Sequence, residues 1–351
     1  MNQLRTRWLN WLFPVLTLVL ALGFTTIILL MTGAPPIAAF RSILEGGLGS
    51  ISRITDVLVA WVPLLLVTMG LLVTFTAGLW NIGIEGQITL GAIFATAVLR
   101  ALQDSTAPPW VIITAAILAG AVGGALWAAL AGVLKTYGGV NEIFGGLGLD
   151  FVALALVLWL IFGPWKRPGI GSMSGTEPFP QSLWLPMFAG TRLSPWSLVI
   201  GLVSLVVVYF LLRGTYFGLK LKAVGRNKQA AGRIGVPTSL YLMLAFIVCG
   251  LFAGIAGSLQ VTAVYHRLIP SISSNYGWIG LLVAMLVNYR AIPAALVALF
   301  FAFLNIGSIR LPIMLKLDST LAGVIQGSLV LFALIANGLR QRINERQEGQ
   351  S

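Results

Sequence analysis

The amino-acid sequence predicts an all-α, polytopic membrane protein: a bundle of about ten transmembrane helices with one short cytoplasmic helix. Hydrophobic residues make up 58% of its 351 residues and charged residues only 9%, and the mean hydropathy is +0.95. Such a chain has too little polar surface to cover a globule in water. The apolar residues also fall into runs of about twenty, the length needed to cross a hydrocarbon core of about 30 Å.

Ten apolar runs are candidates for the transmembrane helices. The run at 82–99 carries Glu85 and Gln87 at its start. The run at 276–288 is too short to cross unless it is tilted, broken or re-entrant. Counts of eight or eleven spans are the alternatives. The predicted spans are 12–31, 57–79, 82–99, 110–134, 143–162, 196–212, 241–263, 276–288, 291–309 and 320–339.

The distribution of positive charge predicts the orientation. Between 213 and 238, two apolar runs are joined by a segment with six cationic side chains and no acidic one. Short basic loops remain cytoplasmic, so we expect both termini inside the cell. The chain, 1–351, is then a single domain of the plasma membrane, the bacterial inner membrane. Its expected parts are a cytoplasmic N-terminus at 1–11, a membrane bundle at 12–339 and a cytoplasmic tail at 340–351.

Composition also excludes several classes of function. The net charge of +12 is spread over loops and tails, so no polar domain presents a groove for nucleic acid. With one cysteine, Cys249, and one histidine, His266, neither a disulfide framework nor a Cys-based or multi-histidine metal site is available. We expect no metal and no cofactor. We interpret His266 as a solvated residue of an outer loop.

Forty glycines occur in the chain, many of them inside the predicted spans. In lipid, close backbone approach through small residues drives the packing of helices, and Gly250-x-x-x-Gly254 fits this pattern. Tight packing of the bundle is one interpretation. The other is a hinge or broken helix that serves alternating access.

The most specific local signal lies at 75–92, where two apolar runs are joined by a turn too short for a loop. Asn81 and Glu85 are four residues apart, so on a helix they would share a face, and Gln87 follows. A carboxylate at membrane depth costs about 3 kcal/mol unless it is paired or hydrated. Glu85 therefore either lines a polar pathway or caps a half-helix at the turn.

Other polar residues lie in or beside apolar runs. We interpret Asn141 and Glu142 as a helix cap and a complement to the helix dipole, with contact to a substrate or partner as the alternative. Asp150, deeper in the same run, requires a partner inside the bundle. The remaining amides individually suit hydrogen bonds between helices, and together they suit a pathway for a neutral, hydroxyl-rich solute. These amides are Asn288, Asn305, Gln326 and Asn337.

The basic segment at 213–238 has features of a helix. Gly225 and Gly235 bracket a short stretch in which Ala230 and Ala231 have good helix propensity. We interpret it as an amphipathic cytoplasmic helix whose Ala-Ala face docks on another protein. The alternative is that its charges serve only orientation and attraction to anionic membrane lipid.

Three motifs resemble those of a known family, the ABC importer permeases of the branched-chain amino acid, ribose and nucleoside type. The resemblance covers 12–339 and is nearest to the nucleoside and simple-sugar branch. The chain departs from the family pattern at Gly145, Gly146 and Asp150, where relatives often carry threonines and an asparagine, and this departure bears on the solute. The motifs are Leu79-Trp-Asn-Ile-Gly-Ile-Glu-Gly-Gln87, Gly139-Val-Asn-Glu142 and Ala223-Val-Gly-Arg-Asn227 followed by Ala230-Ala231.

The resemblance implies partners and residue roles. The partners are a cytoplasmic ATP-binding subunit, a homologous second permease subunit that completes a heterodimer, and an extracytoplasmic solute-binding lipoprotein. This chain has no Gly-x-x-x-x-Gly-Lys-Ser/Thr pattern for ATP. Candidates for the segment that enters a groove of the ATPase are Ala223, Gly225, Arg226, Asn227, Ala230, Ala231 and Gly235. Candidates for the translocation pathway are Asn81, Glu85, Gln87, Asp150, Asn288 and Asn305.

We therefore expect a transport subunit and not an enzyme. ATP binding to the partner moves the cytoplasmic helix and switches the bundle from outward-open to inward-open around a nucleoside or a simple sugar. A permease for another small polar solute, of the branched-chain amino acid type, is the alternative within the family. Outside it, the alternative is a carrier driven by an ion gradient, which would need functional carboxylates deep in several spans; only Glu85 and Asp150 are available.

Overall fold

The computed structural model describes residues 19–20, 22–31, 33–169, 175–287 and 289–315, together with 323–324, 327–328, 331–332, 335–336 and 338. These residues form helices, turns and loops without any strand, which confirms the all-α prediction. They divide into two compact units, Met1–Ile54 with Phe301–Ser351, and Thr55–Phe300.

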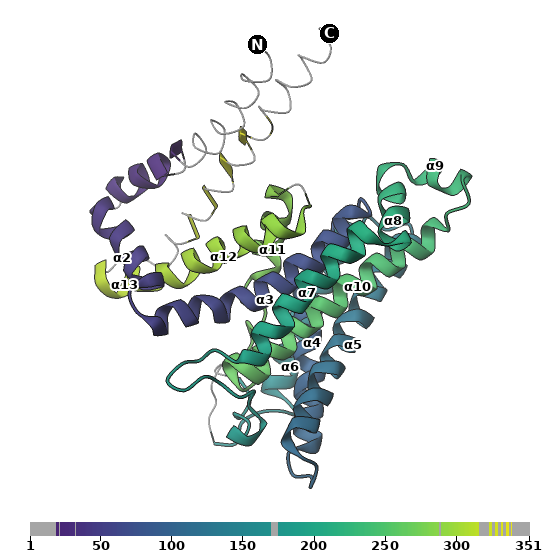
Figure 1. The fold of residues 1–351 in the computed structure, drawn as a ribbon. Coiled ribbons are helices and arrows are strands. Elements are labelled where there is room, and N and C mark those ends of the chain that lie inside the picture. The colour runs from purple at the N-terminus through teal and green to yellow at the C-terminus, as the bar shows by residue number, and fades with distance from the viewer. Residues whose placement is uncertain are drawn as a thin grey trace, which may run out of the picture. The chain divides into compact units, whose positions relative to one another are not determined.

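Figure 1 shows the helices in chain order. Most are long, and two short segments depart from α-helical geometry: a 3₁₀ turn at Gln181–Leu183 and a π-helix at Gln260–Tyr265 that continues α10. The α-helices are α2 (Pro36–Leu48), α3 (Ile51–Thr76), α4 (Ile84–Leu102), α5 (Pro109–Thr136), α6 (Glu142–Phe162), α7 (Pro195–Gly214), α8 (Tyr216–Arg226), α9 (Lys228–Arg233), α10 (Thr238–Leu259), α11 (Tyr276–Leu286), α12 (Ala291–Ser308) and α13 (Arg310–Leu315).

Seven helical segments of the described residues are long and apolar enough to cross a membrane. They correspond to seven of the ten predicted runs. They are Ile51–Thr76, Ile84–Leu102, Pro109–Thr136, Glu142–Phe162, Pro195–Gly214, Thr238–Tyr265 and Ala291–Leu315. An eighth span would combine Leu22–Met31 with α2, which meet at 116°.

The predicted count of ten spans is not reached in the part of the chain that the structure describes. The run at 276–288 forms the eleven-residue helix α11, which confirms that it is too short to cross. Most of the run at 320–339 and the first part of the run at 12–31 lie outside the described residues. The orientation with both termini inside stays a prediction.

Left-handed backbone positions end two of the spans. α3 ends at Thr76, earlier than the predicted run, because the chain turns at Gly78 with φ +74°. At the other end of the bundle, the π-helix that extends α10 stops at His266, which has φ +57°. Glycine tolerates this conformation without cost, whereas a histidine there must be held by its surroundings.

The core of the Thr55–Phe300 unit is built around glycines where α4, α5 and α10 meet. A Cβ atom added to Gly254 would lie 2.1 Å from the carbonyl oxygen of Gly120, and one added to Gly124 would lie 2.3 Å from that of Gly250. Only glycine permits such backbone approach. These contacts confirm that the glycines pack the bundle, including the Gly250-x-x-x-Gly254 pair.

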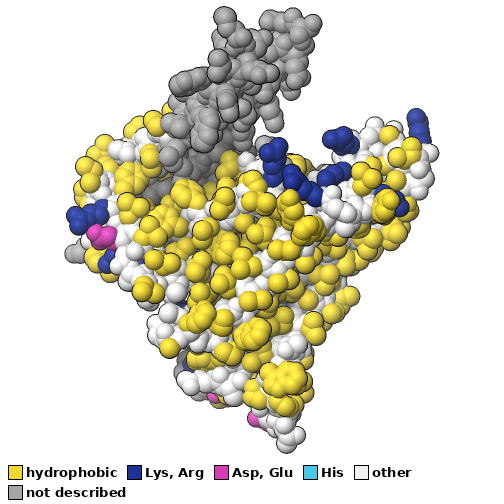
Figure 2. Space-filling model, in the orientation of Figure 1, with side chains coloured by type: hydrophobic (Ala, Val, Ile, Leu, Met, Phe, Trp, Pro, Cys, Tyr) yellow, Lys and Arg dark blue, Asp and Glu magenta, His cyan; other side chains and the backbone are white. Residues whose placement is uncertain are grey.

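The outer faces of α6 and α7 are apolar. Figure 2 shows the same character over much of the visible face of the protein. A surface of this kind would be a liability in water and fits contact with lipid or with another membrane subunit. The exposed side chains on these two helices include Phe144, Phe151, Trp159, Trp196, Val203, Val206 and Phe210.

The unit formed by the two ends of the chain has a small core of its own. Its helices α2 and α12 approach through glycines: a Cβ on Gly46 would lie 2.5 Å from the carbonyl oxygen of Gly307. Glu45 forms an ion pair with Arg41 at 2.7 Å, and its second oxygen lies 3.8 Å from Arg310. Close glycine contacts therefore pack helices in both units.

The loop after α6 is held against the end of the π-helix, and this corrects the interpretation of His266. Backbone hydrogen bonds join Thr176 to Leu268 and Phe179 to His266. The His266 ring is half-buried and stacks on Trp184, with centroids 3.7 Å apart and planes 8° apart. It is not a solvated loop residue. Burial lowers the pKa of His266 below its ordinary value, and the charge of Arg192 adds to this effect.

Candidate functional site

The turn between α3 and α4 holds a closed pair of amides. Asn81 Nδ2 donates to Gln87 Oε1 at 3.0 Å, and Gln87 Nε2 donates back to Asn81 Oδ1 at 2.9 Å. Asn81 also lies 3.1 Å from the Cys249 sulfur. Both amides are buried, at 1% and 0% exposed. Because α4 begins only at Ile84, Asn81 precedes the helix and does not share a helical face with Glu85, contrary to the expectation from their spacing.

Glu85 caps a helix other than its own. Its Oε1 accepts a hydrogen bond from the backbone N–H of Trp278 at 3.1 Å, in the first turn of α11. α11 has no cap from its own N-cap residue, since Asn275 is left-handed and its side chain makes no capping bond. Gly277 permits the approach, because a Cβ there would lie 2.7 Å from Glu85 Oε1. The carboxylate thus meets free N–H groups and the positive end of a helix dipole, which supports the capping interpretation.

Asp150 caps the N-terminus of α4 in the same way. Its Oδ1 accepts the backbone N–H of Gly86 at 2.7 Å, in the first turn of α4, whose own cap position is Gly83. The partner expected inside the bundle is therefore a helix N-terminus. A Cβ on Gly146 would lie 2.6 Å from the Gly83 nitrogen. Two of the three positions that depart from the family pattern, Gly146 and Asp150, thus lie against the first turn of α4.

The start of α6 confirms the local capping prediction. Asn141 is the N-cap and its Oδ1 accepts the N–H of Ile143 at 2.8 Å. Glu142, in the first turn, forms an ion pair with Lys135 at the end of α5. Both residues are occupied in fixing the turn between α5 and α6, which agrees with a structural role.

A polar cluster that the sequence reasoning missed lies where the π-helix meets the loop before α11. Gln260 is 1% exposed, and its Nε2 donates to the Ile272 carbonyl at 3.3 Å and lies 3.2 Å from Ser274 Oγ. The hydroxyl of Tyr265 lies 3.1 Å from the same Ser274. Gln260 Oε1 has no partner among the described residues. A lone glutamine inside an apolar run was the available signal.

The short helix predicted between Gly225 and Gly235 is α9, and a second helix, α8, precedes it in the basic segment. Asn227 has an extended backbone between them, and its Oδ1 caps α9 by accepting the N–H of Ala230 at 2.9 Å. Ala230 is exposed, whereas Ala231 is only 2% exposed. The expected Ala-Ala surface is therefore wrong for Ala231. Ile234, 76% exposed, stands beside Ala230 on the free surface.

A contact between two backbones joins α8 to the turn before α4. A Cβ on Gly225 would lie 2.1 Å from the carbonyl oxygen of Thr76, and one on Gly78 would lie 3.1 Å from the carbonyl oxygen of Gly225. The two motifs are about 140 residues apart in the chain, yet nothing larger than glycine fits between them. A displacement of α8 therefore bears directly on the turn that carries Asn81.

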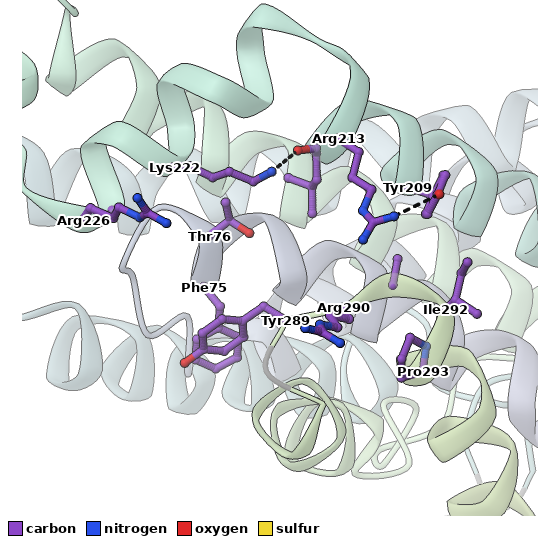
Figure 3. Close-up of a pocket in the computed structure, with 13 residues that line it drawn as sticks. Phe75, Thr76, Tyr209, Arg213, Lys222, Arg226, Tyr289, Arg290, Ile292 and Pro293 are labelled. Carbon is purple, nitrogen blue, oxygen red and sulfur yellow. Dashed lines mark hydrogen bonds between the residues drawn. The ribbon is translucent and has the colours of Figure 1, made fainter. Parts of the chain in front are cut away.

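An open cavity of about 650 Å³ lies beside this contact. Its walls come from the ends of α3 and α7, from α8, from the residues just before α12 and from the first turn of α12. Figure 3 shows four cations around it: Arg213, Lys222, Arg226 and Arg290. Phe75 and Tyr289 stack on another wall, with centroids 5.1 Å apart. We call this region, where α3 and α7 finish and α8 begins, the basic end; Figure 2 shows its lysines and arginines in dark blue.

The remaining candidate residues do not join these groups. Asn288 lies outside the described residues. Asn305 is half-buried in α12 and belongs to the other unit. In the basic segment, Ala223 is half-buried, Arg226 is exposed, and Gly235 has φ +84° at the turn after α9. Among the described residues, no group of three or more histidine, cysteine, aspartate or glutamate side chains could hold a metal ion.

Comparisons with known proteins agree over nearly the whole chain. The model of a family described as branched-chain amino acid transport system / permease component matches residues 53–334. The glucose ABC transporter permease protein TsgB13 of Haloferax volcanii is 29% identical over 337 residues, 93% of this chain and 88% of that protein. The guanosine ABC transporter permease protein NupP of Bacillus subtilis is 23% identical over 94% of each chain. The nucleoside ABC transporter permease protein NupB of Lactococcus lactis is 26% identical over 85% of this chain and 83% of that protein.

Proposed function

The chain belongs to the family of permease components of branched-chain amino acid transport systems, and on this premise we propose that it is one transmembrane subunit of an ATP-driven ABC importer for a nucleoside or a simple sugar. The observation that carries the mechanism is the backbone contact of Gly225 with Thr76 and Gly78. It links the exposed α8–α9 segment to the turn from which α4 begins.

The proposed stroke starts at α9. Ala230 and Ile234 present an exposed apolar surface to a groove of the cytoplasmic ATPase, while the buried Ala231 anchors α9 to the rest of this chain. When ATP closes the ATPase, α8 presses on the turn at Gly78. That turn carries Asn81 and leads into α4, whose Glu85 holds the start of α11. Movement at the basic end thereby reaches the half-helix α11.

The names of similar permeases and the polar groups inside the helix bundle both indicate a neutral, hydroxyl-rich solute. The three similar permeases are named for glucose, guanosine and nucleosides, all neutral solutes with several hydroxyl groups. The interior of this chain offers amides and hydroxyls such as Gln260, Ser274 and Tyr265, and its carboxylates Glu85 and Asp150 each accept a backbone N–H. Such groups suit hydrogen bonds to a neutral polar solute. Branched-chain amino acids, which carry two charges, fit this interior less well.

The proposed assembly has four kinds of component. The exposed apolar faces of α6 and α7 meet lipid or a second, homologous permease subunit. The α8–α9 segment lies in the cytoplasm with both termini and meets the ATP-binding subunit, consistent with the positive-inside rule. A solute-binding lipoprotein delivers the solute on the opposite side of the plasma membrane.

The rival function is a carrier driven by an ion gradient. Such a carrier requires carboxylates free to bind and release ions or protons. Within the described residues, Glu85 and Asp150 each have an oxygen engaged at a helix N-terminus. This favours the ATP-driven system.

Reconstitution separates these functions. The chain is placed in liposomes with its ATPase and sister permease, and uptake of labelled guanosine and glucose is measured with the binding protein present. We expect uptake to require ATP on the side of the membrane to which the ATPase is bound. Collapse of the ion gradients should leave uptake unchanged. Uptake driven by a sodium or proton gradient without ATP would overturn the proposal.

A second experiment tests the docking surface. Replacing Ile234 with Asp should abolish co-purification of the ATPase, because an apolar contact is replaced by an unpaired carboxylate. Phe188→Asp is the matched control, since Phe188 is also an exposed apolar side chain, at 51%, but lies in the loop after α6. Equal loss of the ATPase in both variants, or in neither, would contradict docking at α9.

A further inference from the structure

The cavity at the basic end holds charges that the proposed stroke does not use. Its four cations converge from three separate parts of the chain, with no acidic residue among the thirteen residues that line it. Cations gathered in one place repel each other. A site of this kind is stabilised when an anion enters it.

Two of the four cations are partly engaged and two are free to bind. Lys222 Nζ donates to the Leu212 carbonyl at 2.6 Å, and Arg213 donates to the Tyr209 hydroxyl at 3.2 Å. Each retains further N–H donors. The guanidinium groups of Arg226 and Arg290 have no hydrogen bond or ion pair to any described residue. Their side chains face the cavity from α8 and from the residue before α12.

The chemistry of the walls indicates the class of ligand. Guanidinium groups match the oxygens of a phosphate through paired hydrogen bonds, and lysine adds a point charge. The volume of about 650 Å³ exceeds what a single carboxylate side chain needs and falls in the usual range for small-molecule sites. Tyr209, Tyr289 and Phe75 supply apolar and hydroxyl surface for the rest of the ligand. We propose that this cavity binds a phosphate ester through Arg226, Arg290, Arg213 and Lys222.

The position of the cavity makes the headgroup of an anionic phospholipid one source of this phosphate. α7 ends at the cavity, and its preceding turns expose Val206, Val207 and Phe210. An apolar band that leads directly into a basic pocket is the arrangement that binds lipid headgroups at the cytoplasmic surface. A soluble phosphate ester is the other source. In either case the ligand would bridge α8 to the ends of α3 and α7. It would thereby reduce the mobility of the α8–α9 segment.

The test compares two double variants of the full permease complex. Arg226→Gln with Arg290→Gln removes the two free guanidinium groups. Lys228→Gln with Arg233→Gln removes the same charge from α9, whose residues do not line the cavity. In the lipid arm, complexes purified from mixed phosphatidylglycerol and phosphatidylcholine membranes are analysed by mass spectrometry for retained lipid. In the soluble arm, complexes in phosphatidylcholine nanodiscs are titrated with inorganic phosphate and with glycerol 3-phosphate while the thermal unfolding midpoint is recorded.

We expect about tenfold less retained phosphatidylglycerol in the Arg226/Arg290 variant and about twofold or less change in the Lys228/Arg233 variant. A rise of the unfolding midpoint with the soluble compounds, lost in the same variant, would support the proposal and assign it to a free phosphate ester. Equal losses in both variants would overturn it, because binding would then follow net charge alone. So would a photoreactive residue at position 226 that cross-links to the ATPase while no phosphate compound is retained. Each readout is binding to this chain, so failure here leaves the transport proposal standing.

Discussion

The interior of the Thr55–Phe300 unit and its basic end differ in how far their polar side chains are hydrogen-bonded within the chain. In the interior, Glu85 and Asp150 accept backbone N–H groups of helix first turns, and the amides of Asn81 and Gln87 bond each other. At the basic end, Arg226 and Arg290 line an open cavity, and their guanidinium groups bond to no described residue. The interior bonds most of these polar groups within the chain, although Gln260 Oε1 and Asp150 Oδ2 have no partner among the described residues. The basic end leaves two guanidinium groups available to other molecules.

The difference identifies which polar residues fold the protein. A polar group buried in apolar surroundings costs stability unless it is hydrogen-bonded, so the interior residues had to find partners within the chain. An exposed cation carries little such cost and remains available. The two carboxylates Glu85 and Asp150 each accept a backbone N–H of another helix, which supports a structural role, while the cations of the basic end line an open cavity.

The largest expected effect comes from the contact that joins the two regions. Gly225→Ala places a Cβ within 2.1 Å of the Thr76 carbonyl oxygen, so a backbone must shift. We expect uptake to fall at least about tenfold with normal membrane insertion. Gly232→Ala is the control, since its Cβ would meet only Thr238 at 3.9 Å. Equal uptake by the two variants would contradict a link through this contact.

Glu85 offers the next largest effect. Glu85→Ala leaves the Trp278 N–H without its acceptor, and we expect the free energy of unfolding to fall by about 1–3 kcal/mol. Glu85→Gln keeps an acceptor oxygen and should cost less than about 1 kcal/mol, with uptake close to that of the natural protein. Thermal denaturation and uptake are measured on both. A Gln variant that is stable but inactive would show that the charge itself serves transport, and would break the comparison.

The amide pair allows a smaller but cleaner test. In a double-mutant cycle, Asn81→Ala and Gln87→Ala should be coupled by about 1 kcal/mol in the free energy of unfolding, because each removes the same reciprocal bonds. Gln260→Ala combined with Gln87→Ala is the control pair and should be additive, since the two side chains share no recorded hydrogen bond. Additivity in the first pair would mean that these amides are not each other's partners.

The smallest effect concerns pH and lies in the loop after α6. The folded protein lowers the pKa of His266 through burial, so the imidazole is held neutral against Trp184. The stabilising contribution is present above the unfolded value of about 6.5 and is lost as the pH falls below it. We expect the protection of amides in 176–185, after correction for the intrinsic pH dependence of exchange, to be lower at pH 5 than at pH 7.5, and this difference to vanish in His266→Gln. An equal difference in that variant would assign the effect to another group.

Local features were predictable from the sequence and distant partners were not. The cap at Asn141, the short helix α11 and the glycine packing follow from signals within a few residues. The partner of Glu85 lies 193 residues away and that of Asp150 lies 64 residues away. Sequence spacing does not predict contacts between residues so far apart. The sequence alone therefore could not distinguish a pathway role for Glu85 from a role as a helix cap.

Two errors have simple physical causes. Helix α8 was not predicted before the short helix α9, although Asn227, a residue type that caps helices, marks the boundary between the two. His266 was placed in solvent because charged and polar neighbours in a loop favour exposure; Trp184, which covers it, is 82 residues earlier. The cavity draws its walls from separate parts of the chain and had no local signal.

The touching glycines at positions 78 and 225 have an asymmetric mechanical property. Atoms in van der Waals contact resist compression steeply but separate against an attraction of only about 0.1–0.2 kcal/mol per pair, and no hydrogen bond between these two residues is recorded. This contact therefore transmits a push from one glycine to the other but transmits almost no pull. In the proposed transport cycle, this contact would transmit motion of α8 towards the turn at Gly78 but not the return motion, which would need a restoring force from another part of the assembly.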